Sequence, residues 1–438
     1  MLNSTAQHFH QRRQQLLQTM APNSLLLLPA SPVATRNGSV EYSYRPDSYF
    51  YYLSGFSEPE ACLVLVKDAQ HSTQSILFCR ERHPEQEQWE GKRAGLEGAV
   101  IQYGFDQALP ITQLAEHLPQ LLNGKQTLYQ LFAYAERSET LVSTALQQLR
   151  QQARAGASAP TVIEDITQVL DEMRLIKSPF EVEQMQQAMQ ISAAAHCNAM
   201  RAATPGIYEY QLEAELDYTF RQGGAHHSAY SSIVAGGDNA CILHYVENNQ
   251  LIPDGALVLI DAGCEINGYA SDITRTFPVN GCFSPEQAAI YDIVLQANQA
   301  AIESVAPGQR WNVPHDVTVR VITEGLIALG ILQGELEQLI QSHAYRPYYM
   351  HRAGHWLGLD VHDVGAYQVE GNWRELTPGM VFTIEPGIYI APDDQSVAAK
   401  WRGIGVRIED NVLITDSGYQ VLTQGAPKQR ADIEALMA

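Results

Sequence analysis

Two ten-residue stretches decide the fold of this chain: DGALVLIDAG (residues 254–263) and PGMVFTIEPG (residues 378–387), which align without a gap. Each has an early glycine, an apolar strand and an acidic residue followed two positions later by glycine. The matched residues are Gly255 with Gly379, Asp261 with Glu385, and Gly263 with Gly387. We interpret the two stretches as equivalent strands of a duplicated unit, against the alternative that two apolar strands look alike by chance.

Matching helix signals precede the two strands. In SPFE (residues 178–181), Ser178 is a candidate N-cap, proline follows at the first helical position, and Glu181 completes a capping box. SPEQ (residues 284–287) repeats this signal. Each predicts a long helix, ending near residues 203 and 306, and a second helix follows each, ending near residues 222 and 329. Two helices followed by strands in each half predict an α/β (α+β) domain with pseudo-twofold symmetry.

The chain of 438 residues is too long for a single compact core, so we expect more than one domain. Before the duplicated part, NSLLLLPAS and ACLVLVKD have the pattern of buried strands, and helices are interspersed with them. The polar segment QQARAGASAP (residues 151–160) is typical of a loop or linker. We therefore predict an amino-terminal mixed α/β domain over residues 1–173 and a second domain over residues 174–438.

Charge and composition exclude several classes of partner. The chain has 28 Lys and Arg against 49 Asp and Glu, a formal net charge of −21. Nucleic acids and anionic membranes attract basic surfaces, so we expect neither as a partner. SLLLLPA is too short to cross a bilayer, and the amino terminus lacks the pattern of a secretory signal. Six scattered cysteines, none in a C-x-x-C pair, are expected to be reduced, which predicts a cytoplasmic protein.

The first acidic strand is predicted to form a hairpin that carries two aspartates. Asn267-Gly268 is a strong signal for a two-residue turn, and this turn would place Asp272 opposite Gly263. Asp261 lies two residues before Gly263 on the same face of the strand. The β-carbons of the two aspartates should then be roughly 5.5–8 Å apart, as diagonal neighbours in a sheet are. Gly263, which has no side chain, is expected to leave the space between them open.

The second acidic strand offers a matching pair, Glu385 and Glu409, with Arg407 on the same face as Glu409. If the halves are duplicated, the four carboxylates converge. Repulsion and burial would force protons onto some of them unless cations are bound. Two divalent cations would balance the charge. Oxygen-rich ligands with one imidazole suit Mn²⁺ best, with Co²⁺, Fe²⁺ or Zn²⁺ as alternatives.

The stretch MHRAGHWLGLDVHD (residues 350–363) supplies the candidate imidazole. His351 and His355 are four apart but lack the glutamate of the H-E-x-x-H zinc motif, which excludes that type of site. His355, followed by WLG, is the best placed to complete the metal site. His351 and His362 are then expected to support the metal ligands or to face the substrate.

The ordered set Asp261, Asp272, His355, Glu385 and Glu409 resembles the dinuclear site of the pita-bread metallopeptidases. The flanking motifs CILHYVEN, DAGCEINGYASDITRTFPVNG, HWLGLDVHDVG, EPGIYIAP and RGIGVRIEDNVLIT are most similar to bacterial aminopeptidase P. The resemblance covers nearly the whole chain, including RPDSYFYYLSGF and QWEG in the amino-terminal domain. One departure is HRAGH (residues 351–355), because the family often has glycine after the first histidine. This departure concerns substrate fit near His351 and not the metal ligands.

The resemblance implies a pita-bread fold for residues 174–438 and a metal-dependent exopeptidase. The enzyme would release the first residue of peptides that have proline second, through attack by a hydroxide that bridges two metal ions. Asp272 and Glu409 would bridge the metals, and Glu385 would also exchange the proton between nucleophile and leaving nitrogen. The resemblance also implies that His362 and His244 stabilise the intermediate and orient the substrate. It implies that His351, Tyr389 and Arg407 form a wall around the proline and support the metal ligands.

Several assignments have simpler alternatives. His244, His351, His362 and Tyr389 could be ordinary packed residues, and Glu409 could merely pair with Arg407. For Trp89 in QWEG, packing is the preferred interpretation, and contact with substrate, even in a neighbouring subunit's site, is the alternative. By analogy with relatives, the amino-terminal domain is expected to restrict access to the pocket and to support a homo-oligomer, a dimer or a tetramer. Rival functions are an Xaa-Pro dipeptidase on the same scaffold, a binding module without catalysis, and a metal-free amidinohydrolase like creatinase.

Overall fold

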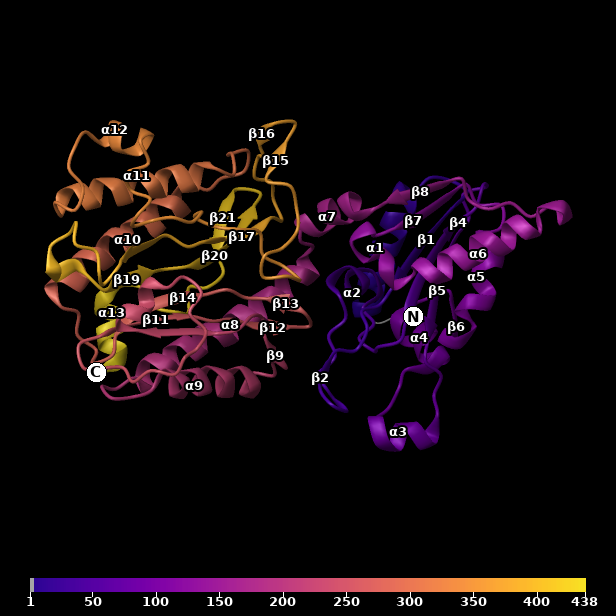
Figure 1. Cartoon of the computed structure of the whole chain (residues 1–438), viewed down its shortest axis with the longest axis horizontal. Helices are drawn as coiled ribbons and strands as arrows, with labels where there is room; N and C mark the ends of the chain where they lie inside the picture. Colours follow the sequence, from indigo (N-terminus) through magenta and orange to yellow (C-terminus); the bar gives the residue numbers. More distant parts are fainter. Residues whose placement is uncertain (1–3) are drawn as a thin grey trace. The chain divides into compact units, whose positions relative to one another are not determined.

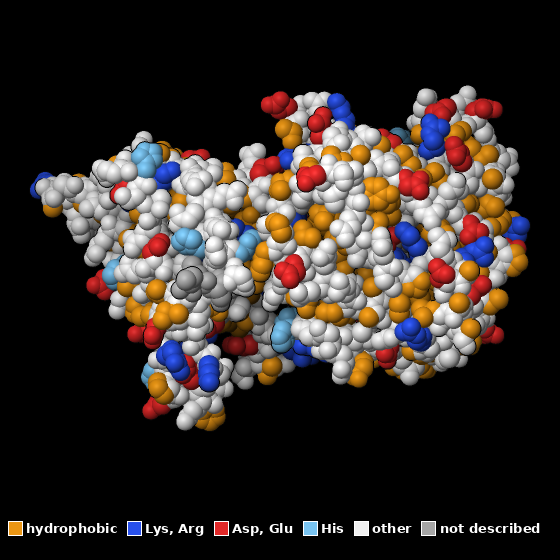
Figure 2. Space-filling view, turned by 180° about the vertical axis from the view of Figure 1, so that it is seen from behind, with side chains coloured by type: hydrophobic (Ala, Val, Ile, Leu, Met, Phe, Trp, Pro, Cys, Tyr) orange, Lys and Arg blue, Asp and Glu red, His pale blue; other side chains and the backbone are white. Residues whose placement is uncertain are grey.

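A computed structural model describes residues 4–438, and the chain divides into two compact units, Met1–Met173 and Arg174–Ala438 (Figure 1). The α/β class expected from the sequence is confirmed. On the face drawn in Figure 2, hydrophobic side chains lie scattered among acidic and basic ones. None of the described helices combines the length and the apolar character needed to span a bilayer.

The first unit is built on a mixed six-stranded sheet with the order β6-β5-β4-β1-β7-β8. Strand β1 pairs antiparallel with β4 and parallel with β7. The strands are β1 (Ser24–Pro29), β4 (Cys62–Lys67), β5 (Thr73–Cys79), β6 (Gln107–Pro110), β7 (Thr127–Gln130) and β8 (Val162–Asp165), with a separate pair β2 (Thr35–Asn37) and β3 (Val40–Glu41). The two predicted buried strands are confirmed as β1 and β4.

The helices of the first unit are α1 (Ser4–Thr19), α2 (Ser48–Ser54), α3 (Pro84–Glu90), α4 (Gly95–Tyr103), α5 (Leu114–Leu122) and α6 (Glu139–Gln151), and α7 (Thr167–Leu175) contains the boundary. The polar segment 151–160 follows α6 and precedes β8, so it is a loop inside this unit. Leu118, Leu122 and Leu149 from α5 and α6 pack against sheet residues such as Val64 and form the core.

The second unit contains the predicted helix pairs. Helices α8 (Pro179–Ala202) and α9 (Glu209–Gln222) precede the first strands, and α10 (Pro285–Glu303) and α11 (Val313–Ala328) precede the second. Ser178 and Ser284 each accept a hydrogen bond from the backbone three residues on, and both capping boxes are formed. Figure 1 shows one helix pair beside each group of strands. The predicted helix starts are confirmed because the same N-cap chemistry operates twice.

The strands of the second unit repeat as well. Among its sheets, one three-stranded sheet of the first half has the order β10-β11-β14, and one of the second half has the order β17-β20-β21. Their members are β10 (Ile233–Gly236), β11 (Leu257–Asp261), β14 (Thr274–Pro278), β17 (Val381–Ile384), β20 (Asp410–Thr415) and β21 (Gly418–Val421). The matched stretches of the sequence lead into β11 and β17, so the predicted duplication is confirmed.

Shorter strands continue each sheet beyond its acidic residues. They are β9 (His227–Ser228), β12 (Cys264–Ile266), β13 (Tyr269–Ala270), β18 (Gly387–Ile390) and β19 (Ile404–Arg407). The remaining elements of the unit are β15 (Gln368–Val369), β16 (Asn372–Trp373), α12 (Leu336–Gln341) and α13 (Arg430–Met437). Apolar faces of α8 to α11 pack on the strands in one large core that includes Leu216, Val258, Val294 and Ile322.

The predicted hairpin register is confirmed. Asn267 and Gly268 both have positive φ, 50° and 79°, as a type I′ turn requires. Asp261 pairs with Thr274, and the backbone amide of Ala262 donates to the carbonyl of Ile273, so no residue is inserted between the turn and β11. The expected reason for Gly263 is wrong, however. A β-carbon there would overlap the carbonyl oxygen of Ser271, so the glycine allows close approach of the partner strand.

Candidate active site

The second unit encloses a cavity of ≈ 870 Å³ beside the interrupted strands. Its wall includes every predicted metal ligand and most of the other predicted site residues. They are Asp261, Asp272, His355, Glu385 and Glu409, together with His244, His351, His362 and Arg407. His244 and Glu409, which are 165 positions apart in the chain, thus line one space, and it is large enough for a short peptide.

The four acidic residues all lie where paired strands separate. Asp261 ends β11 and Asp272 comes shortly before β14, which pairs with β11. Glu385 lies between β17 and β18, and Glu409 lies between β19 and β20. The same interruption therefore occurs in each half, and each supplies two carboxylates to one cavity.

The donor atoms approach one another closely. One ligand atom from each of Asp272, His355 and Glu409 lies within 4.8 Å of the other two. His355 Nε2 is 3.4 Å from an oxygen of Asp272 and 3.7 Å from an oxygen of Glu385. Carboxylate oxygens with one imidazole nitrogen form a donor set suited to divalent first-row cations. The residues present therefore fit the metal centre that the sequence predicts.

Burial and mutual repulsion raise the pKa values of three of the four acids. Burial raises the pKa of Asp261, and Asp272 adds to the effect while Arg407 opposes it. Burial raises the pKa of Glu385 to about 7, although the charges of His355 and Arg407 oppose this. Burial and the charges of Asp272, Glu385 and Asp261 raise the pKa of Glu409 well above its usual range. The folded chain by itself holds more negative charge here than it neutralises.

Asp272 and His355 each stabilise the charged form of the other side chain. Burial opposes ionisation of both, but their hydrogen bond and opposite charges lower the pKa of Asp272 and contribute to raising that of His355 to about 9. The other ring nitrogen of His355, Nδ1, lies 2.9 Å from the carbonyl oxygen of Trp356 and donates to it. This bond aims Nε2 at the acids, which is how proteins commonly orient a metal-binding histidine.

His351 lies on the opposite flank of Glu385. Its Nδ1 donates to the carbonyl of Arg352 at 2.8 Å, and its Nε2 accepts from the hydroxyl of Tyr389 at 2.9 Å. Burial and the charge of Arg407 lower the pKa of His351 to about 4, so its ring is neutral at pH 7. A neutral ring held from both sides keeps one orientation.

Tyr389 is placed differently from the expectation. It is buried and does not line the cavity, because His351 and Arg407 stand in front of it. Its hydroxyl accepts a hydrogen bond from Arg407 at 3.1 Å and donates to His351. Arg407 in turn donates to Asp261 at 2.7 Å. The predicted direct contact of Tyr389 with substrate is therefore corrected to a contact with the residues that form the wall.

His244 and His362 both line the cavity. The ring of His362 stands edge-on to that of His355, with 4.4 Å between centroids. Burial and the charge of His355 lower the pKa of His362. Trp89, by contrast, lies on α3 in the first unit with 89% of its surface exposed. The preferred interpretation of Trp89 as a packed residue is wrong.

Sequence reasoning missed residues that hold the acids in place. The hydroxyl of Tyr230 lies 2.7 Å from an oxygen of Asp261 and 2.6 Å from one of Asp272. Thr274 donates to Glu409, Thr383 to Glu385, and Asn411 exchanges hydrogen bonds with the backbone of Asp272. Thr274, Thr383 and Asn411 lie within two residues of an acid in the chain, and that proximity was the available signal. Tyr230, 31 positions before Asp261, carried none.

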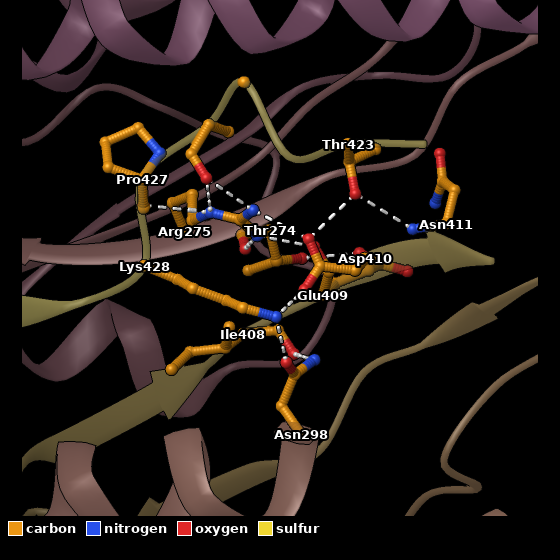
Figure 3. Close-up of polar contacts among 12 residues, drawn as sticks. Thr274, Arg275, Asn298, Ile408, Glu409, Asp410, Asn411, Thr423, Pro427 and Lys428 are labelled. Atoms are coloured by element: carbon orange, nitrogen blue, oxygen red, sulfur yellow. Dashed lines mark hydrogen bonds and ion pairs between the residues drawn. The ribbon is translucent and has the colours of Figure 1, made fainter. Parts of the chain in front are cut away.

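Behind Glu409 lies a buried network centred on Asp410, drawn in Figure 3. Arg275 donates to one carboxylate oxygen of Asp410 at 2.8 Å, and Lys428 donates to the other at 2.6 Å. Thr423 adds a hydrogen bond at 2.8 Å. Burial opposes ionisation of Asp410, but the charges of Arg275 and Lys428 hold its pKa well below the usual range.

The same network holds the backbone around the metal-ligand candidates. Arg275 donates to the carbonyls of Thr274 and Glu409, and also to those of Ala426 and Pro427. Lys428 donates to Asn298 of α10, whose amide nitrogen lies near the carbonyls of Ile384 and Ile408 (Figure 3). Ile384 precedes Glu385 and Ile408 precedes Glu409, so α10, β14 and the segment after β21 are tied to both glutamate-bearing strands.

Comparison with known proteins finds the same architecture over the full length. The model of metallopeptidase family M24 matches residues 183–416, and that of the aminopeptidase P N-terminal domain matches residues 9–129. The chain is 46% identical over 431 residues to Xaa-Pro aminopeptidase of Escherichia coli, covering 98% of this chain and 97% of that protein.

Solved structures agree. Aminopeptidase PepP of Pseudomonas aeruginosa aligns with a TM-score of 0.97 and 54% identity over 100% of this chain and 99% of that one. Aminopeptidase P of E. coli with the inhibitor Pro-Leu aligns with a TM-score of 0.95 and 46% identity, covering 99% and 98%. The cavity described above therefore lies in a chain that is similar to these proteins from end to end.

Proposed function

The chain belongs to metallopeptidase family M24 with the amino-terminal domain of aminopeptidase P, and we propose that it is an Xaa-Pro aminopeptidase. It releases the first residue of peptides whose second residue is proline. The observation that carries the proposal is the convergence of five candidate metal ligands in one peptide-sized cavity. The full-length similarity to Xaa-Pro aminopeptidases supports the choice of substrate.

We propose that the cavity holds two divalent metal ions, with Mn²⁺ as the metal in use. Asp261, Asp272, His355, Glu385 and Glu409 would hold them. The raised pKa values of Asp261, Glu385 and Glu409 support this, because bound cations remove the cost of ionising these acids. When bound, such ions polarise a carbonyl group and lower the pKa of water.

The side chains around the acids have distinct proposed roles. Glu385 takes a proton from the attacking water on a carboxylate oxygen and passes it to the proline nitrogen as the bond between that nitrogen and the carbonyl carbon of the first residue breaks. His362 and His244 donate to the oxygen of the former carbonyl and orient the substrate. His351 forms the wall beside the proline. Arg407 and Tyr389 hold Asp261 and His351 in place, as their hydrogen bonds support.

Replacing Glu385 by alanine is the sharpest test of this mechanism. We expect hydrolysis of an Xaa-Pro-Yaa tripeptide to fall by about 10²–10⁴-fold because proton transfer is lost. Metal content should be measured on the same samples, so that loss of metal and loss of proton transfer are separated. Glu375→Ala, which removes an exposed glutamate outside the cavity, is the matched control. Near-normal hydrolysis by Glu385→Ala would remove the proposed role.

A paired substrate assay separates the rival functions. An Xaa-Pro dipeptidase requires the free carboxylate directly after proline, so it would cleave Xaa-Pro and leave Xaa-Pro-Yaa intact. We expect cleavage of the tripeptide, and more of it with added Mn²⁺ than with a chelator. A binding module would cleave neither peptide and would purify without stoichiometric metal.

We further propose a cytoplasmic homo-oligomer, a dimer or a tetramer. The six cysteines are all free, which suits a reducing compartment. Exposed Trp89 supports a contact with another subunit, because large aromatic side chains are enriched at protein interfaces. Sedimentation of the wild type and Trp89→Ala tests this, and a wild type that sediments as a monomer would contradict it.

A further inference from the structure

Arg352 is a residue of the cavity wall that the proposed mechanism does not use. It follows His351 directly, and both residues line the cavity. Its guanidinium carbon lies 4.8 Å from the centre of the Trp373 indole ring, and Trp373 also lines the cavity. Stacking on an indole limits the freedom of a long side chain, so the guanidinium is already positioned before a ligand arrives.

The charge of Arg352 is unpaired. Arg407, the other guanidinium on the cavity wall, is buried and donates to Asp261 and Tyr389. Within residues 4–438, Arg352 forms no ion pair, and its backbone carbonyl is occupied by His351. The cavity therefore combines a cluster of buried acids with one exposed, uncompensated cation.

We infer that Arg352 selects peptides that carry a carboxylate on the carboxyl-terminal side of the proline. The inference rests on the proposed function, in which the first residue and the scissile bond occupy the acidic end of the cavity. The part of the peptide after proline is then left to contact the remaining wall, where Arg352 stands with Trp373. A guanidinium binds a carboxylate through two parallel hydrogen bonds.

Two groups offer this chemistry. One is the terminal carboxylate of a tripeptide, and the other is an acidic side chain at the third residue. Because Arg352 is exposed, we expect a preference of about three- to tenfold and no larger.

The experiment compares four peptides that share Ala-Pro: Ala-Pro-Ala with a free carboxylate, Ala-Pro-Ala amide, Ala-Pro-Glu amide and Ala-Pro-Lys amide. Each is assayed with the wild type, Arg352→Gln and Arg352→Glu, all loaded with Mn²⁺. Ratios of kcat/KM between peptides are taken within each enzyme, so differences in active concentration cancel. Arg352→Lys, which keeps the positive charge but cannot form two parallel hydrogen bonds to a carboxylate, is the conservative control.

We expect the wild type to prefer the free acid over its amide, or Glu over Lys, through KM. Arg352→Gln should lose that preference, Arg352→Lys should keep part of it, and Arg352→Glu should favour Lys. A changed acid-to-amide ratio identifies the terminal carboxylate as the ligand, and a changed Glu-to-Lys ratio identifies the side chain.

Ratios that are the same in the wild type and Arg352→Gln would overturn the inference. Failure of the wild type to cleave Ala-Pro-Ala amide and Ala-Pro-Ala alike would instead overturn the proposed function. The two failures are therefore distinguishable in one data set.

Discussion

Glu409 and Asp410 are neighbours in the chain and both are buried, but the charges that surround their carboxylates are opposite in sign. Consecutive residues of an extended segment point to opposite sides, so the two carboxylates enter different surroundings (Figure 3). Glu409 faces three other acids, and its pKa is raised by burial and their charges. Asp410 faces Arg275 and Lys428, and its pKa is lowered despite burial.

The contrast teaches how to distinguish a functional acid from a structural one. The surroundings of Asp410 supply two cations and a hydroxyl group, so its charge is satisfied within the chain. Glu409 receives a hydrogen bond from Thr274, and among the residues that the structure describes no Lys or Arg side chain is bonded to its carboxylate. The fold compensates the charge of Asp410 fully and leaves that of Glu409, one residue away, uncompensated. This difference indicates that Glu409 belongs to a site that binds a cation from solution.

The largest effect is expected from removing the satisfied acid. Asp410→Ala leaves Arg275 and Lys428 buried without their carboxylate, and we expect the free energy of unfolding to fall by about 3–5 kcal/mol. Urea denaturation of the metal-free protein measures this. Glu409→Ala, one residue away, is the matched comparison and should not be destabilised comparably. Equal destabilisation of both variants would break the contrast.

Glu409→Gln tests the other side of the comparison. It removes one buried negative charge and keeps the shape, so we expect the metal-free protein to be as stable as the wild type or more stable. Hydrolysis of an Xaa-Pro-Yaa tripeptide should fall by more than about 100-fold, since even residues that only support metal ligands commonly cost 10–100-fold. Calorimetric titration with Mn²⁺ should show weakened binding. Retained activity and affinity would contradict the assignment of Glu409 as a ligand.

The smallest effect is a difference in pH dependence. The pKa of Glu385 in the folded, metal-free protein is about 7, above its ordinary value near 4.5. The stability it contributes is therefore present below about pH 4.5 and lost as pH rises through 7. From pH 5 to pH 8, we expect the wild type to lose about 2–3 kcal/mol relative to Glu385→Gln.

Asp410→Asn provides the contrast to this titration. Because the folded pKa of Asp410 is lowered, its contribution is present above the unfolded pKa and is lost only in acid below that value. The stability difference between the wild type and Asp410→Asn should be constant from pH 5 to pH 8. A slope there, or a flat difference for Glu385→Gln, would show that the two acids are not perturbed in opposite directions.

The sequence predicted what depends on local pattern. The N-caps Ser178 and Ser284 and the turn at Asn267-Gly268 are local chemical signals, and the structure contains all of them. Register propagates along a hairpin, so the turn was enough to predict which residue faces Asp261 on the paired strand. The five candidate ligands were found because the duplication and the flanking motifs marked them.

What the sequence could not predict depends on contacts between distant segments. Arg275 reaches Ala426, 151 positions away, and Tyr230 bridges two aspartates from a loop without a motif. Both Glu409 and Asp410 stand in an apolar strand pattern, and nothing in RIEDNV says which of them is paired. For Trp89 the sequence favoured packing over contact with substrate, whereas the fold leaves its side chain exposed.

The position of the network in the chain sets when its contacts can form during synthesis. A nascent chain that the ribosome has extended only to Glu409 already contains all five candidate ligands. It lacks Thr423, Ala426 and Lys428, so Arg275 cannot yet be held on both sides. The network around Asp410 is therefore complete only after these later residues have been added.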